Sequence, residues 1–139
     1  MSLFGGLRVS ASALSAERLR LNVIAENIAN AETTRTPEGG PYRRREVILA
    51  SGMGLGEPGE RGSAGGVHVA GVLPDPTPPR LVHDPSHPDA NAEGYVAMPN
   101  VDVPAEVVDM MAATRAYEAN ALALQSQRRL QERALELLA

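Results

Sequence analysis

The sequence has 139 residues, a formal net charge of −4 and no cysteine, and its length supports one small domain with a single core. The negative charge argues against a nucleic-acid partner, and the absence of cysteine excludes disulfides, thiolate catalysis and cysteine-ligated metals. Hydrophobic residues make up 43% of the chain but aromatic residues only 3%, a balance that suits helix packing better than a ligand pocket.

Helix-breaking residues are concentrated in the middle of the chain. All eleven prolines and eleven of the thirteen glycines lie in residues 37–104. The sequence therefore divides into an N-terminal segment (1–36), a central segment (37–104) and a C-terminal segment (105–139). Residues 7–36 and the whole C-terminal segment contain neither Gly nor Pro, which predicts one long helix at each end of the chain.

The N-terminal segment carries a heptad-like apolar pattern. Leu7, Leu14, Leu21 and Ile28 recur every seven residues, as on one face of a helix. No run of about 20 apolar residues is present, so no membrane-spanning helix is predicted. The first residues lack a basic region followed by a compact apolar stretch, so we expect no cleaved secretory signal peptide.

The central segment predicts loops and short strands. Runs of β-type residues between turn residues predict four strands, at residues 47–50, 67–72, 80–83 and 95–98. Residues 52–66 contain almost no apolar side chain to bury, so this stretch is expected to be mobile.

Basic residues cluster at the start of the central segment. Arg43, Arg44 and Arg45 are followed by Glu46, and the triplet is interpreted as a solvated or subunit-facing strand. Tyr42 alone offers no stacking platform for nucleic-acid bases. The sequence also contains no nucleophile elbow, P-loop or dinucleotide fingerprint, so nucleotide and nucleophilic chemistry have no support.

The best candidate for metal binding is HDPSHPD, residues 83–89. His83 and His87 would converge on one metal if this stretch were helical, but Pro85 and Pro88 prevent a regular helix. A rigid turn with Asx-type hydrogen bonds is therefore the preferred interpretation. No catalytic residue, cofactor or metal site is predicted.

The C-terminal segment has the strongest helical pattern. Steps of alternately three and four residues visit mostly apolar positions, which favours coiled-coil-like packing. These positions are Val107, Met110, Thr114, Tyr117, Ala121, Leu124, Arg128, Gln131, Leu135 and Leu138. A packed aromatic ring is expected at Tyr117 rather than a catalytic role.

These elements predict a mainly α fold, in which two long terminal helices form an antiparallel coiled-coil-like hairpin and the central segment supplies loops and short β-strands. The helices should be roughly 35–40 Å and 50 Å long. Further apolar residues lie off both predicted faces, and a lone pair of helices cannot cover them. We therefore expect other chains to bury them.

Two stretches resemble a known family. Residues 21–46, LNVIAENIANAETTRTPEGGPYRRRE, are similar to the N-terminal signature of flagellar basal-body rod proteins. Residues 84–124, with DPSHPDANAEGYVAMPNVDV and VVDMMAATRAYEANALAL, resemble the second half of the FlgC-type proximal rod subunits of that family. The chain departs from the family at Pro104 and Ala105, where a bulkier helix start is usual, and at Val82 and His83, where an aromatic is usual.

The resemblance implies a structural subunit of a rod that crosses the periplasm and transmits torque. It implies export through the flagellar type III apparatus without a cleaved signal peptide, and contacts with other rod subunits and a basal-body adaptor protein. It also implies self-assembly through the terminal helices, which form the inner tube. The residues expected at the subunit interface are Leu7, Leu14, Leu21, Asn27, Ile28, Asn30, Met110, Tyr117, Asn120 and Leu124.

The sequence leaves two alternative functions. A free-standing helical adaptor or secreted coiled-coil protein would form an oligomer of fixed stoichiometry, whereas a rod subunit associates openly through heterologous contacts. A metal hydrolase that uses His83 and His87 would retain a stoichiometric metal after purification.

Overall fold

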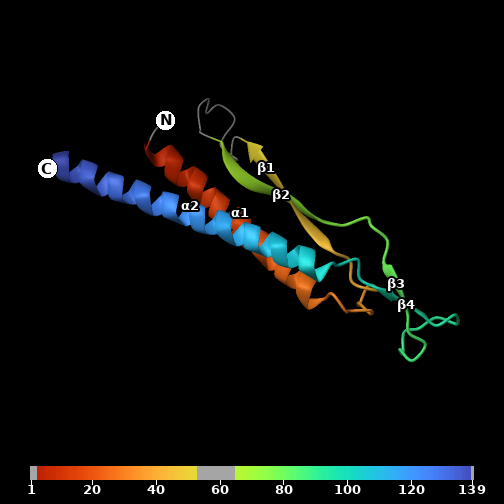
Figure 1. Ribbon diagram of the computed structural model, residues 1–139. Coiled ribbons are helices and arrows are strands. Elements are labelled where there is room, and N and C mark those ends of the chain that lie inside the picture. The colour runs from red at the N-terminus through yellow and green to blue at the C-terminus, as the bar shows by residue number, and fades with distance from the viewer. Residues whose placement is uncertain (1–2, 53–64, 139) are drawn as a thin grey trace.

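Two long helices dominate the computed structural model, which describes residues 3–52 and 65–138 (Figure 1). Helix α1 spans Leu3–Ala29 and helix α2 spans Val103–Leu138. The helices lie side by side in opposite directions, and the C-terminal end of α2 extends beyond the N-terminal end of α1. The predicted mainly α architecture with two long helices is confirmed, whereas coiled-coil-like winding of the pair remains a prediction.

Both helices differ at their ends from the sequence expectation. Helix α1 continues through Gly6 and ends at Ala29, because the Ala31 N–H bonds the Ile28 carbonyl (3.2 Å) in a tighter turn. The expected N-terminal helix, which ran to residue 36, was therefore too long. Helix α2 begins at Val103, two residues before the predicted C-terminal segment, and Pro104 lies in its first turn, as its sequence position allows because a missing N–H is tolerated there.

Two contacts show how the helices are aligned. Asn27 of α1 is hydrogen-bonded to Glu106 of α2, and a Cβ added at Gly6 would lie 2.8 Å from Nε2 of Gln127. The two contacts are 21 residues apart on each helix, which is three heptads. The same face of each helix therefore points toward the other along this whole length.

On α1 the facing residues are displaced by one position from the predicted stripe, whereas on α2 Met110, Tyr117 and Leu124 belong to both the predicted and the facing set. Counted from the two contacts at heptad spacing, the facing residues are Gly6, Ser10, Ala13, Glu17, Arg20, Ile24 and Asn27 on α1, and Glu106, Met110, Ala113, Tyr117, Asn120, Leu124 and Gln127 on α2. Leu7, Leu14, Leu21 and Ile28 lie beside this face and are half-buried. The prediction followed the largest apolar side chains, whereas small residues such as Gly6 let the helices approach closely.

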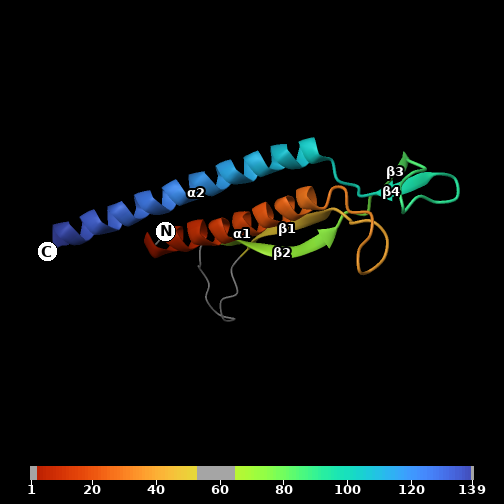
Figure 2. The same ribbon diagram turned by 90° about the horizontal axis from the view of Figure 1, so that it is seen from below.

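A two-stranded antiparallel ribbon covers the other side of α1. Strand β1 (Arg45–Gly52) pairs with strand β2 (Gly66–Pro74). The molecule therefore has three layers along the helices: α2, then α1, then the ribbon (Figure 2). Among the helices and strands within the described ranges, α2 contacts α1 alone.

Ser12 of α1 anchors the ribbon to the helix. Its Oγ accepts the N–H of Val67 in β2 (3.1 Å) and donates to the carbonyl of Val9 (2.8 Å). A Cβ at Gly66 would lie only 2.6 Å from this Oγ. The ribbon thus approaches α1 closely at this point.

A second antiparallel hairpin lies at the end of the molecule away from both termini (Figure 1). Strand β3 (Arg80–His83) pairs with strand β4 (Tyr95–Met98), so all four predicted strands are present. Gly94 precedes β4 with a positive φ of 80°. An added Cβ there would lie 3.0 Å from Cγ of Pro85, which makes glycine the residue that fits.

The loop between β3 and β4 confirms the predicted Asx-type turn. The N–H of Ser86 bonds Oδ1 of Asp84 (3.1 Å), and Asp89 accepts hydrogen bonds from Thr34 and Arg35. The loop is therefore tied to the chain that follows α1. Within residues 3–52 and 65–138, no three or more His, Asp or Glu side chains gather where a metal ion could bind.

The core is small and aliphatic. Its buried apolar side chains are Ala16, Val23, Ile24, Ala31, Val96, Val101 and Ala113. Neither described helix has a stretch long and apolar enough to cross a membrane. The stretch at 52–66, which was expected to be mobile, lies mostly outside the described residues.

Candidate subunit interface

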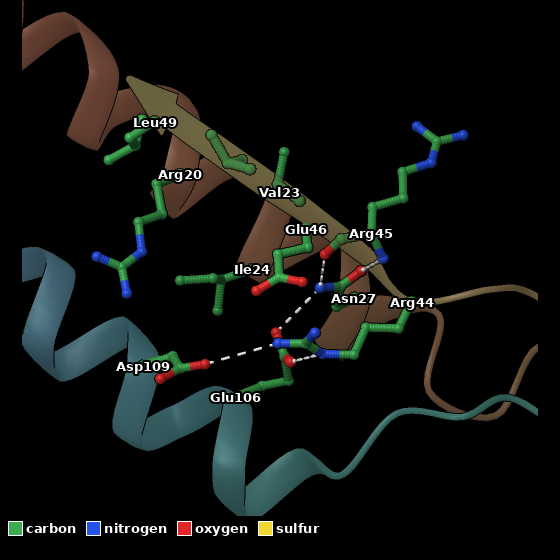
Figure 3. A pocket seen from close by; sticks show the side chains of 11 residues that line it. Arg20, Val23, Ile24, Asn27, Arg44, Arg45, Glu46, Leu49, Glu106 and Asp109 are labelled. Carbon is green, nitrogen blue, oxygen red and sulfur yellow. Dashed lines mark hydrogen bonds and ion pairs between the residues drawn. The ribbon is translucent and has the colours of Figure 1, made fainter. Parts of the chain in front are cut away.

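Asn27 is the centre of a polar joint between α1, α2 and the start of β1 (Figure 3). Its Nδ2 donates to Oε2 of Glu106 (3.0 Å) and to the carbonyl of Arg45 (2.9 Å). Its Oδ1 accepts from the hydroxyl of Tyr42 and from the N–H of Arg45, both at 2.9 Å. The side chain, which is 1% exposed, thereby uses its whole hydrogen-bonding capacity.

Glu106, in the first turn of α2, is the buried charge of the joint. It is 1% exposed, and its Oε1 accepts a hydrogen bond from Nε of Arg44 (2.5 Å). Arg44 also lies 3.4 Å from Asp75 and 3.7 Å from Asp109. Burial alone would lower the pKa of Arg44, but the hydrogen bond and charge of Glu106, with the nearby carboxylates, raise it. The guanidinium of Arg44 is therefore held in its charged form beside Glu106.

Two further side chains connect the joint to the loops. Burial raises the pKa of the Tyr42 hydroxyl, whose hydrogen bond to Asn27 closes the loop after α1. Oδ1 of Asn100 accepts the N–H of Arg44 (2.8 Å), and its Nδ2 donates to the carbonyl of Thr77 (2.9 Å). The residues that precede α2 are thus fixed to the residues that precede β1.

The joint lines a small cavity between α1, α2 and β1, but its chemistry is structural. Both oxygens of Glu106 are held by donors, and the amide of Asn27 is fully bonded. Figure 3 shows the Arg45 side chain pointing away from this cavity, with its backbone bonded to Asn27. The arrangement holds three elements together and presents no activated nucleophile or base.

The sequence-predicted interface residues fall into three groups. Leu7, Leu14, Leu21, Ile28, Met110 and Leu124 are half-buried along the paired helices, and Tyr117 is 38% exposed. Asn120 donates to the carbonyl of Ala116 in its own helix, and Asn30, directly after α1, donates to the carbonyl of Glu26. Asn27 lies inside the chain, in the polar joint. Their contacts with a second subunit remain predictions.

A second apolar stripe runs along the outer side of α2, turned away from α1. Its large side chains are strongly exposed: Val108 65%, Met111 52%, Leu122 64%, Leu130 58% and Leu137 88%. Near its start, a shallow groove is lined by Val107, Met110, Met111, Thr114 and Arg115. No described helix or strand other than α1 contacts α2, so this stripe is uncovered in the single chain.

Sequence reasoning missed the joint. It placed Arg44 on a solvated or subunit-facing strand and assigned no role to Glu106 or Asn100. One signal in the sequence could have found it. Glu106 lies at the start of a helix that must bury one face, and a buried carboxylate needs a cationic partner. The triplet that contains Arg44 could supply that partner. In the sequence, the outer stripe is visible only as apolar residues off the predicted face.

Comparisons with known proteins agree on one family. The model described as "Flagella basal body rod protein" matches residues 7–35, and the model described as "Flagellar basal body rod FlgEFG protein C-terminal" matches residues 92–137. The two matched ranges include Asn27 and Glu106, the two residues whose hydrogen bond joins α1 to α2.

Three relatives named flagellar basal-body rod protein FlgC are similar to the chain over almost its whole length. The protein of Borreliella burgdorferi is 41% identical, with 99% of each chain covered. That of Yersinia enterocolitica is 44% identical, covering 99% of this chain and 98% of the relative. That of Bacillus subtilis is 42% identical, with 99% of each chain covered.

Proposed function

The chain belongs to the flagellar basal-body rod protein family, of the FlgC type, and we propose that it builds the rod by packing its two terminal helices against neighbouring subunits. It is a structural subunit of the basal-body rod. The proposal adds how such a subunit polymerises and which surfaces it uses. It gives the chain no enzymatic role.

The observation that supports this mode of assembly is the exposed outer stripe of α2. Six large apolar side chains of α2 are more than half exposed, five of them on this stripe and the sixth, Leu135, outside it, and α1 is the one described element that α2 contacts. Such a stripe marks an interaction surface on a soluble protein. If a different surface of the neighbour covers it, the contact is heterologous and extends into an open assembly rather than a closed oligomer.

Polar atoms along the paired helices also favour completion by neighbours. Within the described part of the chain, Oε1 of Gln127 and Nε2 of Gln131 are buried without hydrogen bonds. Oε2 of Glu17 likewise has no hydrogen bond, although Nη1 of Arg20 lies 3.7 Å away. Unpaired buried polar groups are unfavourable, so we infer that these side chains change conformation on assembly and find partners as neighbouring subunits complete a coiled-coil-like packing.

The partners and location follow from the same proposal. We infer that the subunit contacts other rod subunits and a basal-body adaptor protein, and that it forms part of the proximal rod, the periplasmic drive shaft. We also infer export through the flagellar type III apparatus without a cleaved signal peptide. The relatives' name, flagellar basal-body rod protein FlgC, supports membership of the rod. The adaptor contact, the proximal position and the export route are inferred from that membership.

A deletion and complementation experiment in the source bacterium tests the proposal. Removal of the gene should stop flagellation before the hook forms, and the wild-type gene should restore it. Met111→Glu should fail to restore it, because a charge would enter the outer stripe. Glu118→Gln, on an exposed site of the same helix, is the control. Normal flagella after deletion, or after complementation with Met111→Glu, would reject the assembly mode.

A further inference from the structure

The polar joint is an unusual way to hold two helices together. Asn27 and Glu106 are each 1% exposed, and the charge of Glu106 is removed from water to meet Arg44. Apolar residues of the same size often replace a buried ion pair without loss of stability. The joint is therefore explained poorly by stability, and its best-attested alternative role is to select one alignment.

The rest of the contact face selects an alignment through the shapes of its side chains. Small side chains such as Gly6, Ala13 and Ala113 lie along it beside larger ones such as Tyr117. Gln127, on the same face, has its Oε1 buried without a hydrogen bond in the observed alignment. This oxygen therefore does not stabilise that alignment. A slip would, however, remove Glu106 from both of its donors.

We propose that Asn27, Arg44 and Glu106 are positioning residues that select a single axial register of α1 against α2. Through the bonds of Asn27 to Arg45, they also fix the start of β1 relative to that register. The inference rests on the proposed function, since the register decides which residues each subunit presents to its neighbours. A slip of one heptad would displace one helix along the other by about 10 Å. The outer stripe of α2 would then no longer match the same surfaces of the next subunit.

The chemistry of Asn27 fits this role. It bonds the N–H and the carbonyl of Arg45 as a neighbouring strand would, and it keeps one more donor for Glu106. An aspartate could not donate to Glu106 and would add a like charge. Arg44 contributes through its planar guanidinium, which reaches Glu106 while it lies near Asp75 and Asp109.

The test is a distance measurement on the purified chain, which has no native cysteine. Spin labels are attached at Ser15→Cys and Ser126→Cys, exposed sites on α1 and α2, and pulsed electron resonance gives their distance distribution. The key variant is Arg44→Met with Glu106→Leu, which replaces the ion pair by apolar groups. Asn27 keeps its bonds to Arg45 in this variant, and Glu106→Gln alone is measured as a milder change.

We expect one narrow distance in the wild type and additional distances in the double variant, which should stay folded and unfold at a slightly lower urea concentration, because one N–H of Asn27 loses its acceptor. Glu106→Gln should broaden the distribution in the same direction. Arg35→Met with Asp89→Leu, which removes an ion pair between two loops, should keep the single distance. A double variant that is unfolded, or that keeps the wild-type distribution, overturns the inference.

The role in assembly is read separately in cells. The double variant should yield at least tenfold fewer basal bodies than the wild type, and the Arg35 and Asp89 control should yield normal numbers. Several distances together with normal basal bodies would overturn the link between register and assembly. Normal flagella after gene deletion would reject the proposed function. The distance measurement would still test whether Asn27, Arg44 and Glu106 select a single register of the helices.

Discussion

Asn27 of α1 and Glu106 of α2 are hydrogen-bonded over 3.0 Å in the interior of the chain, although 78 residues lie between them in the sequence. The pair joins the C-terminal end of α1 to the first turn of α2, and the N–H and carbonyl of Arg45 add the start of the ribbon to the same point. Stability and alignment of the helices therefore depend on a few polar atoms at one end of a long contact.

Asn27→Ala should lower the free energy of unfolding by about 3 kcal/mol, because Glu106, Tyr42 and the Arg45 N–H would each lose a buried partner. Asn22→Ala, at an exposed position of the same helix, should change it by less than about 0.5 kcal/mol. Urea unfolding followed by circular dichroism gives both values. Equal effects of the two substitutions would mean that the joint contributes nothing beyond helix propensity.

The sequence predicted the elements well because their signals are local. Gly and Pro placement identified both helices, and short β-type runs located all four strands. The phase of the helix contact is not a local property, since it depends on which side chains permit close approach. Gly6 and Ala113 have little or no apolar side chain, so the spacing of larger side chains predicted Leu7 and Thr114 on the contact face instead. The joint was missed for the same reason, because it unites residues from three distant segments.

Acid should weaken the loop after β3. Hydrogen bonds from Thr34 and Arg35 hold the pKa of Asp89 below its usual value, so the folded state favours the ionised carboxylate. The resulting stabilisation is fully present above the unfolded pKa of about 3.9 and is lost as pH falls through the lower folded pKa. The stability difference between wild type and Asp89→Asn should therefore shrink below about pH 4.

The measurement is urea unfolding of both proteins at several pH values from neutral to strongly acid. Glu93→Gln, an exposed carboxylate on the same loop, is the control for removal of a negative charge. A difference between wild type and Asp89→Asn that stays constant across the series would show that the ionised form of Asp89 gives no net stabilisation.

Gly94→Ala should destabilise the β3–β4 hairpin by about 1–2 kcal/mol, since the residue has a φ of 80° and its new Cβ would lie 3.0 Å from Pro85 and 3.2 Å from His83. Gly71→Ala in β2 is the matched control, because no atom lies within 4 Å of the added Cβ. Hydrogen exchange of the β4 amides should accelerate in the first variant alone. Unchanged exchange at β4 would contradict the steric argument.

Leu122 and Leu124 lie two residues apart on α2 and should separate folding from assembly. Leu124 is half-buried on the face toward α1, so Leu124→Asp should lower the free energy of unfolding by roughly 2–4 kcal/mol. Leu122 is 64% exposed on the outer stripe, so Leu122→Asp should change it by less than about 0.5 kcal/mol. Both variants should nevertheless fail to form rods.

The reason for the shared assembly defect is repetition. With Leu122→Asp, every subunit in a rod would have to desolvate the introduced carboxylate or give up the apolar contact, and the penalty recurs at each interface. Urea unfolding of the free chains, together with electron microscopy of basal bodies from complemented cells, separates the two effects. A collapse in the stability of Leu122→Asp would mean that the chain itself covers the outer stripe. Normal rods with this variant would mean that the outer side of α2 is not an assembly surface.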